Sequence, residues 1–285
     1  MKIENQNTIS NDNESSKDTN SSSEKNVSKK SAAIIRRIVL IIAAFCFCFS
    51  AVMLIKIFLE YKQGDDIYNN IQDSVLDNNY PSEITIDDKK VEVPFKYNHQ
   101  ELLSINPEGV GYLYIPSIDL RLPIVHPSDN DFYLTHTFNK TENKDGCLFE
   151  DCNIKDGLES SHIIIYGHNM KNGSMFGKLS QYEKADFYSS SGNDMVYIYT
   201  ENKLKMYRIF SAYTSEPVSD TYTYNFPSLE SLQQYASSMK AKSDYSTNVD
   251  VSNASCILTL STCTSDGSKR FIVQAVYVGE GILQD

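Results

Sequence analysis

The chain has 285 residues, of which 41% are hydrophobic and 22% are charged, and 37 acidic residues against 26 basic ones give a net charge of −11. This length suits one domain with appendages, or two small domains. The acidic balance argues against a nucleic-acid-binding protein, whose domain would carry a basic face. A mean hydropathy of −0.37 excludes a polytopic membrane protein.

The amino-terminal part combines a polar tail with one long apolar stretch. Residues 1–31 are dominated by Asn, Ser, Lys and Glu, so we expect a disordered tail. From Ile38 to Ile55, 18 consecutive residues carry no charge, and a helix of that length spans about 27 Å, close to the roughly 30 Å hydrocarbon core. We predict a transmembrane signal-anchor over residues 32–59. The alternatives are a buried core helix and a cleaved signal peptide, whose apolar region is typically shorter.

The charges around this stretch predict its orientation. Five basic residues precede it closely and only two follow it closely, namely Lys25, Lys29, Lys30, Arg36 and Arg37 against Lys56 and Lys62. The positive-inside rule therefore places the amino terminus in the cytoplasm and the rest of the chain outside. Residues 1–37 carry a net charge of +2, which leaves −13 for the remainder. We expect a single-pass protein of the cell membrane whose acidic part is extracellular.

Residues 60–105 are predicted to form a helical extension, because Ile67, Ile71, Val75 and Leu76 recur at helical spacing. This helix either packs on the main domain or forms a stalk. From about residue 106 the pattern changes to short β-type runs at 112–115, 122–125, 162–166, 196–200, 205–212, 256–262 and 271–278. One helix is predicted over residues 228–241, with Ser228 as its cap. The pattern indicates a mostly β barrel or sandwich over residues 106–285.

The six cysteines differ in their settings. Three have apolar surroundings, in the predicted span or in a strand: Cys46, Cys48 and Cys256. Cys147 and Cys152 lack zinc-ligand spacing, and both an extracellular disulfide and two free thiols are open interpretations. Cys263 stands at a strand end just before the turn-forming residues 264–268, so its sulfur is expected to reach solvent.

Two strands joined by that turn predict a reactive site. If they pair antiparallel, Cys263 and Arg270 lie opposite each other with Cβ atoms roughly 4.5–5.5 Å apart, and Ser261 lies on the same face. A guanidinium there favours thiolate over thiol and can hold a carbonyl oxygen. His168 directly follows a predicted strand and is the best-placed proton-handling partner. The other histidines lack a comparable setting: His99, His126, His136 and His162.

These residues carry a family resemblance. Thr259-Leu260-Ser261-Thr262-Cys263, with Arg270 downstream and Tyr166-Gly167-His168 upstream, resembles the signature of sortases, the cysteine transpeptidases of Gram-positive bacteria. The resemblance extends over about residues 106–279. The sequence is similar to class B members in particular around Asn106-Pro107, at residues 128–134, at residues 167–176 and in the helix at 228–241.

The resemblance implies a fold and a set of roles. Residues 106–285 would form an eight-stranded sortase-type β-barrel with a few helices. Cys263 would be the nucleophile, His168 its acid/base partner, and Arg270 would steady the oxyanion or the peptide. Asn130, Leu134 and Ser261 would line the peptide groove. The mechanism requires no metal and no cofactor.

The implied partners are proteins and cell-wall amines. The thiolate would attack the carbonyl carbon of a Thr in a sorting motif near the carboxyl terminus of a surface protein, forming a thioester acyl-enzyme. An amine of peptidoglycan or of its lipid-linked precursor would then resolve the thioester and fix the protein to the wall.

Three alternatives compete with this interpretation. An L,D-transpeptidase-like peptidoglycan cross-linker would place glycine before the nucleophile and Arg or Asn close after it, whereas Thr262 precedes Cys263 here and Arg270 is seven residues on. A pilus-polymerising sortase would typically carry a lid segment. A non-catalytic anchored adhesion module would bury Cys263, so rapid alkylation by iodoacetamide distinguishes it from an enzyme.

Overall fold

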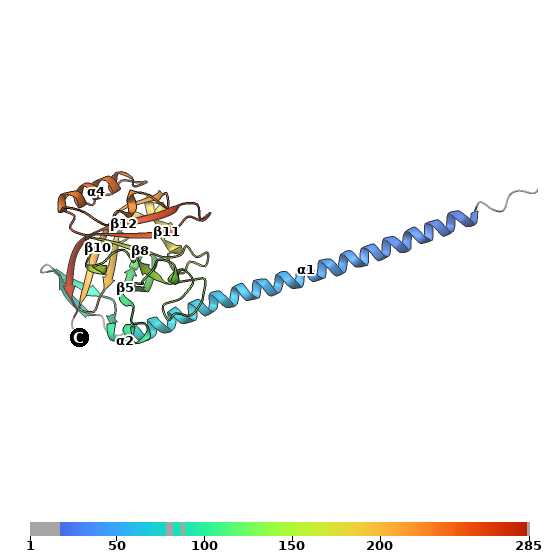
Figure 1. Cartoon of the computed structure of the whole chain (residues 1–285), viewed down its shortest axis with the longest axis horizontal. Helices are drawn as coiled ribbons and strands as arrows, with labels where there is room; N and C mark the ends of the chain where they lie inside the picture. Colours follow the sequence, from blue (N-terminus) through green and yellow to red (C-terminus); the bar gives the residue numbers. More distant parts are fainter. Residues whose placement is uncertain (1–17, 78–81, 87–88, 284–285) are drawn as a thin grey trace, which may run out of the picture. The chain divides into compact units, whose positions relative to one another are not determined.

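The computed structural model describes residues 18–77, 82–86 and 89–283 (Figure 1). The chain divides into two units, residues 1–58 and 59–285. Helix α1 (Asp18–Val75) belongs to both. In the first unit its apolar side chains are exposed, and among the described residues it is the one helix long and apolar enough to cross a membrane.

Helix α1 begins earlier than the sequence predicted. Residues 18–31, expected to be disordered, are helical, whereas the first 17 residues of the predicted tail lie outside the described part of the chain. This segment is rich in Ser and Asn, which are weak helix formers, and only its Glu and three Lys favour a helix. Extending an existing helix, however, costs far less than nucleating one. The apolar stretch therefore propagates its helix toward the amino terminus.

The second unit begins with the end of α1. Tyr68, Ile71 and Val75 are buried in the main core, so this part of the helix packs on the domain. Residues 60–105 are helical only at their two ends, and the β-branched residues between them are concentrated in two short strands. That middle forms two small antiparallel pairs, β1 (Leu76–Asp77) with β4 (Lys96–Tyr97) and β2 (Ser82–Ile86) with β3 (Lys89–Val93), followed by α2 (His99–Ile105).

Eight strands then close into a barrel in the order β10-β12-β11-β8-β7-β6-β5-β9. Two neighbouring pairs, β6 with β7 and β8 with β11, are parallel, and the others are antiparallel. The predicted eight-stranded barrel is confirmed. The strands are β5 (Gly109–Ile115), β6 (Leu120–Val125), β7 (Leu148–Glu150), β8 (His162–Tyr166), β9 (Met195–Tyr199), β10 (Lys203–Ser215), β11 (Ile257–Cys263) and β12 (Arg270–Ile282).

The alternation of side chains along β11 separates a core face from a site face. Leu258 and Leu260 enter the main core, to which every barrel strand contributes. Thr259, Ser261 and Cys263 lie on the opposite face because successive side chains of a strand point to opposite sides. The same alternation on β12 places Gln274 and Arg270 on that face, opposite Thr259 and Cys263.

Helix α4 (Leu229–Ala241) covers part of this second face (Figure 1). Ser228 caps it, as predicted, by accepting a hydrogen bond from Ser231 N. Its apolar stripe packs with residues of β10, β11 and β12 in a second core. The shorter helices are η1 (Pro116–Ile118), η2 (Phe132–Leu134), η3 (Gly157–Glu159), η4 (Gly177–Glu183), α3 (Ala185–Tyr188) and η5 (Asp220–Tyr222).

Candidate active site

A single pocket of about 260 Å³ brings together all six site residues predicted from the sequence. They come from segments far apart in the chain: the loop around η2, the end of β8, and the β11–β12 hairpin. The predicted residues are Asn130, Leu134, His168, Ser261, Cys263 and Arg270. The remaining lining residues are Phe149, Tyr166, Gly167, Pro217, Tyr222 and Thr262.

Cys263 is the last residue of β11 and pairs with Arg270 across the hairpin, in the predicted register. Its side chain is half-buried. The turn between the two strands is held by hydrogen bonds from Thr264 Oγ1 and Ser268 Oγ to Asp266, at 2.6 and 2.8 Å. These bonds and the Ser268 amide lower the pKa of Asp266 to about 2. The register between Cys263 and Arg270 therefore rests on an ordered turn.

Within the part of the chain that the structure describes, Arg270 donates only to main-chain carbonyls, with Nη1 3.1 Å from Lys269 O and 3.4 Å from Gly267 O. A guanidinium carries five N–H donors. Most of its donors are thus free to meet a ligand in the pocket.

His168 is held by the loop that follows β8. A side chain at Gly167 would place Cβ 2.4 Å from Leu148 Cδ2, so only glycine fits between the strand and the histidine. The Nε2 atom of His168 lies 2.6 Å from Leu134 O. Because a carbonyl only accepts, Nε2 carries the proton, and the neutral imidazole keeps Nδ1 as its free basic nitrogen.

The loop of His168 is also tied to the strand of Cys263. Asn169 Nδ2 donates to Cys263 O at 2.8 Å, and Gly167 N donates to Ser261 O at 3.2 Å. These two bonds couple the positions of the imidazole and the thiol, since both side chains are attached to the bonded segments.

One wall of the pocket is organised by a buried carboxylate, Asp151. It accepts hydrogen bonds from Asn130 Nδ2 at 3.2 Å and from Tyr166 OH at 2.8 Å. Burial alone would raise the pKa of Asp151, but hydrogen bonds from Asn153, Tyr166 and Asn130 outweigh it and lower the pKa. Asn130 Oδ1 in turn accepts from Cys152 N at 2.9 Å. The Asn130 amide is therefore fixed with one N–H left for a ligand.

Another part of the pocket lining comes from the connection between β10 and α4. Tyr222 OH lies 3.0 Å from Ser261 Oγ, and its ring stacks on Tyr166 with centroids 6.1 Å apart. Burial raises the pKa of the Tyr222 hydroxyl, the hydrogen bond to Ser261 and the charge of Arg270 lower it, and Cys263 raises it. Tyr222 thus lies within electrostatic reach of both hairpin residues.

The sequence missed the lining residues Phe149, Pro217 and Tyr222, and it missed Asp151, which holds Asn130 and Tyr166. Tyr166 was quoted only as part of the string before His168, although its position directly before Gly167 was a usable signal. Asp151 and Tyr222 carry no local signal, because their places depend on contacts with Asn130, Tyr166 and Ser261.

Cys147 and Cys152 are free thiols. Cys147 is buried beside Tyr68, and burial raises its pKa to about 12. Among the residues that the structure describes, no group of three or more His, Cys, Asp or Glu side chains could hold a metal ion.

Comparison with known proteins gives a consistent family. A model described as the Sortase domain matches residues 113–278. Sortase B of Listeria monocytogenes is 31% identical over 216 residues, covering 74% of this chain and 85% of the relative. Sortase B of Staphylococcus aureus is 29% identical over 181 residues, covering 62% and 72%.

Solved structures agree. Sortase B from Bacillus anthracis in complex with AAEK1 has a TM-score of 0.65 at 25% identity, covering 78% of this chain and 99% of that chain. Clostridium perfringens sortase B has a TM-score of 0.59 at 30% identity, covering 64% and 100%. A Staphylococcus aureus sortase B–substrate complex has a TM-score of 0.58 at 26% identity, covering 64% and 84%.

A thiol, an imidazole and a guanidinium lining one pocket of an eight-stranded barrel match the cysteine transpeptidases. The chain belongs to the sortase family, and within that family to class B. Its activity is that of a cysteine transpeptidase with a protein-sorting function. The L,D-transpeptidase-like and non-catalytic adhesion interpretations are not favoured.

Proposed function

We propose that Cys263, His168 and Arg270 carry out the transpeptidation. The observation that carries this assignment is that the three side chains line one pocket together with the three predicted groove residues. The His168 imidazole takes the proton of the Cys263 thiol and becomes an imidazolium. The resulting thiolate attacks the carbonyl carbon of a Thr in a sorting motif, and a C–S bond forms. The peptide C–N bond then breaks, and the leaving amine takes a proton from the His168 imidazolium. The product is a thioester between the Thr and Cys263.

Arg270 and the groove residues bind the reacting peptide. The free donors of the guanidinium stabilise the negative charge that develops on the Thr carbonyl oxygen. Asn130 donates its remaining N–H to a peptide carbonyl, Leu134 supplies an apolar contact, and Ser261 contributes to the floor of the groove. The hydrogen bond from His168 Nε2 to Leu134 O engages that nitrogen, so Nδ1 is the nitrogen that takes and returns protons.

The second half-reaction transfers the acyl group to a cell-wall amine. An amine of peptidoglycan or of its lipid-linked precursor attacks the thioester and loses a proton to His168. A new amide bond forms, the C–S bond breaks, and the Cys263 thiolate is restored. The substrate is a surface protein with a carboxyl-terminal sorting motif, a proposal supported by the substrate complex known for the Staphylococcus aureus neighbour.

The chain is anchored so that this chemistry takes place outside the cell. Residues 32–59 span the membrane, residues 1–31 lie in the cytoplasm, residues 60–105 connect the span to the domain, and residues 106–285 form the extracellular catalytic domain. The exposed apolar side chains of α1 and the basic residues before them support this topology.

A library screen tests the function. The full chain in detergent micelles is incubated with candidate sorting pentapeptides, with and without an added amine, and the products are identified by mass spectrometry. We expect cleavage after Thr, transfer to the amine, and loss of both in Cys263→Ala. Full activity of Cys263→Ala would overturn the assignment.

A further inference from the structure

We propose that Gln274, Tyr235 and His162 are positioning residues that hold Tyr222 in the wall of the active-site pocket. None of the three lines the pocket itself. The proposal rests on the proposed function, because it concerns how the sorting peptide is bound.

The position of Tyr222 depends on its own backbone. It is the last residue of η5, in the connection between β10 and α4, and it reaches the pocket from there. The residues on either side, Thr221 and Thr223, each present a main-chain carbonyl to the layer beneath α4. Fixing the Thr221 carbonyl fixes the peptide unit directly before Tyr222, and fixing the Thr223 carbonyl holds the chain one residue after it.

Both carbonyls form hydrogen bonds with buried side chains. Tyr235 OH donates to Thr221 O at 2.6 Å, and His162 Nδ1 lies 2.6 Å from Thr223 O. A carbonyl only accepts, so Nδ1 of His162 carries the proton. Its Nε2 atom must then accept, which it does from the hydroxyl of Thr259 at 2.7 Å.

Two chains of hydrogen bonds, one ending at Thr221 O and one at Thr223 O, start from the side-chain amide of Gln274. Its Nε2 atom lies 3.0 Å from Tyr235 OH and 2.9 Å from Thr259 Oγ1. An amide nitrogen has two hydrogens, one for each chain of hydrogen bonds. One chain runs from Gln274 through Tyr235 to Thr221 O. The other runs through Thr259 and His162 to Thr223 O, so every donor along both chains points the same way.

The network is shielded from water. Gln274, Thr259, His162 and Thr221 are fully buried, and the second core surrounds them. A buried donor or acceptor that loses its partner is costly, because no water replaces the bond. Burial lowers the pKa of His162 to about 4, which keeps the ring neutral at pH 7, as the direction of the bonds requires.

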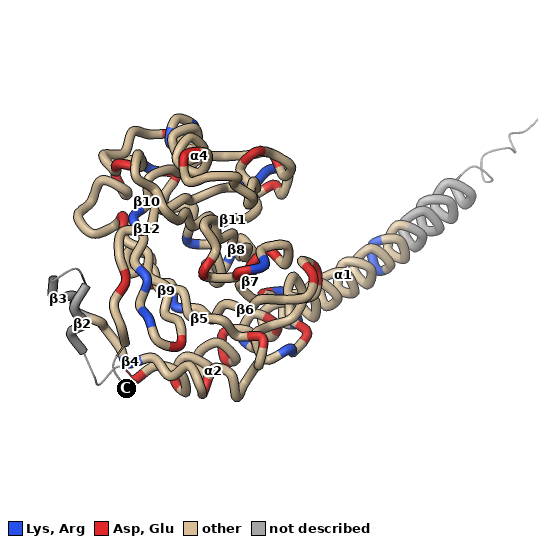
Figure 2. Tube along the Cα trace, turned by 60° about the vertical axis from the view of Figure 1, so that its left-hand side comes forward, with Lys and Arg blue, Asp and Glu red and all other residues tan. Residues whose placement is uncertain are grey.

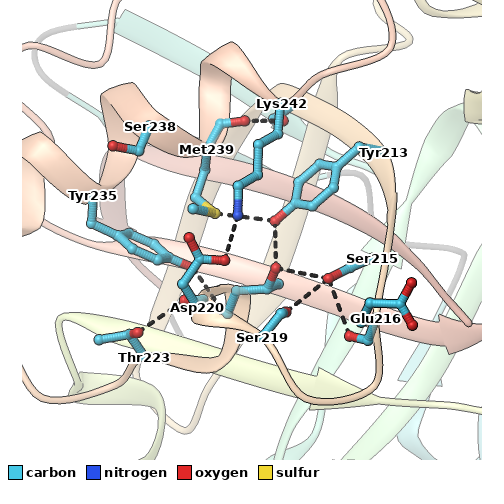
Figure 3. Close-up of polar contacts among 12 residues, drawn as sticks. Tyr213, Ser215, Glu216, Ser219, Asp220, Thr223, Tyr235, Ser238, Met239 and Lys242 are labelled. Atoms are coloured by element: carbon cyan, nitrogen blue, oxygen red, sulfur yellow. Dashed lines mark hydrogen bonds and ion pairs between the residues drawn. The ribbon is translucent and has the colours of Figure 1, made fainter.

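Further contacts stiffen the same segment. Thr221 Oγ1 lies 2.9 Å from Tyr213 OH and 3.1 Å from Ser215 Oγ. Figure 3 shows Tyr213 and Ser215 pointing toward this segment on one side and Tyr235 on the other. Lys242 of the turn after α4 forms an ion pair with Asp220. The wall is therefore preformed before any peptide binds.

The position of the network beneath the pocket follows from strand alternation. Cys263, Ser261 and Thr259 succeed one another on the same face of β11. Cys263 lines the pocket, Ser261 meets Tyr222, and Thr259 joins the buried network. Along β11, the network thus begins at Thr259, two residues from Ser261, which lines the pocket.

Tyr235→Phe tests the proposal, because it removes only the hydroxyl that holds Thr221 O. Tyr112→Phe is the matched control, since Tyr112 is also buried and donates to a main-chain carbonyl, Arg121 O, at 3.0 Å without lining the pocket. In the full chain in micelles, with the best-cleaved pentapeptide of the library, we expect KM to rise about tenfold in Tyr235→Phe with kcat within about twofold. Tyr112→Phe should keep its KM.

A double variant tests whether Tyr235 acts through Tyr222. In a Tyr222→Ala background, Tyr235→Phe should change KM no further, because the side chain that it positions is gone. The iodoacetamide alkylation rate of Cys263 should be the same in wild type and Tyr235→Phe. An unchanged KM in Tyr235→Phe, or an equal effect in both backgrounds, would overturn the proposal.

Amide hydrogen exchange separates this proposal from the proposed function. The amide exchange rate of peptides covering residues 216–227 should be higher in Tyr235→Phe than in wild type. In Tyr112→Phe this rate should be unchanged. If the wild type cleaves no pentapeptide, the proposed function fails while the exchange data still test the positioning. If the wild type cleaves peptide and Tyr235→Phe matches Tyr112→Phe in KM and exchange, the positioning role fails alone.

Discussion

Arg270 illustrates how a single residue can be identified from strand pairing. The turn-forming residues 264–268 set the register, and the register places the guanidinium opposite Cys263. Its few contacts, all to carbonyls of its own turn, leave the charge uncompensated by any carboxylate among the contacts described for it. Such a group is suited to stabilising an oxyanion, because its donors are in place before the charge develops.

Arg270→Lys tests this role. An ammonium cannot reproduce the planar, two-point contact of a guanidinium, so we expect kcat/KM for the sorting peptide to fall about 100-fold. Steady-state kinetics on the best-cleaved pentapeptide provide the measurement. Near-normal kinetics would show that Arg270 is only a surface charge.

Asp151 is a second residue whose contacts predict a measurable effect. It is the shared acceptor for Asn130 and Tyr166, so its removal takes one hydrogen bond from each of these side chains. We expect Asp151→Ala to lower kcat/KM about tenfold or more, mainly through KM. Asp250→Ala is the control, since Asp250 also accepts main-chain and side-chain bonds, from Ser252, but is exposed outside the pocket. Equal kinetics in the two variants would contradict the role of Asp151.

At the scale of elements, helix α1 contacts the loop that supports His168. Tyr68 OH donates to Gly146 O, and a side chain at Gly146 would come within 3.1 Å of His168 Cδ2. Next to Gly146, Asp145 is almost fully buried, and both of its carboxylate oxygens lack a hydrogen-bond partner among the described residues. The helix approaches it closely at Gly64, where a Cβ would lie 2.1 Å from Asp145 Oδ2.

Asp145 predicts a pH-dependent stability. Burial and the nearby charge of Asp65 raise the pKa of Asp145 from 3.8 to about 6. The folded state therefore binds more protons than the unfolded state between these values, so ionisation of this group opposes folding progressively from about pH 4 and fully above about pH 6. We expect Asp145→Asn to have a higher Tm than wild type at pH 7.5, with an advantage that shrinks as the pH falls from 6 toward 4. Thermal unfolding across this range is the measurement, and a pH-independent difference would contradict the prediction.

The elements also show what the sequence could and could not predict. The β8 strand was predicted with its observed bounds, and the predicted helix at 228–241 differs from α4 only by including the cap residue Ser228. Both predictions succeeded because apolar patterning and a capping serine are local signals. The strand β7 was missed, since three residues are too few for a pattern. Cys263 and Arg270 were found through their turn. Tyr222 was not, because its partner Ser261 is 39 residues away and no local spacing reveals the contact.

At the scale of the whole molecule, the charge distribution matches the proposed topology. The segment up to residue 37 carries +2 and the remainder −13. Acidic and basic residues are interspersed around the catalytic unit (Figure 2). Such a surface gives no support for phosphate-backbone binding, which depends on clustered Lys and Arg.

Protease protection tests the orientation. In right-side-out protoplasts carrying the full chain with an amino-terminal epitope tag, added protease should digest the catalytic domain and leave the tag intact, because the tag lies inside. Detergent-permeabilised protoplasts, in which the tag is also lost, provide the control. Loss of the tag without permeabilisation would show that the amino terminus lies outside the cell and would contradict the proposed orientation.

The acyl-enzyme is the most direct test of the account, because every proposed role converges on one covalent intermediate. The full chain in micelles is mixed with the best-cleaved pentapeptide without an added amine, and its intact mass is measured. We expect a mass increase equal to that of the peptide acyl fragment ending in Thr. The adduct should lie on Cys263, be released by hydroxylamine and be absent in Cys263→Ala. Peptide cleavage without an adduct on Cys263, or an adduct that persists in Cys263→Ala, would contradict the account.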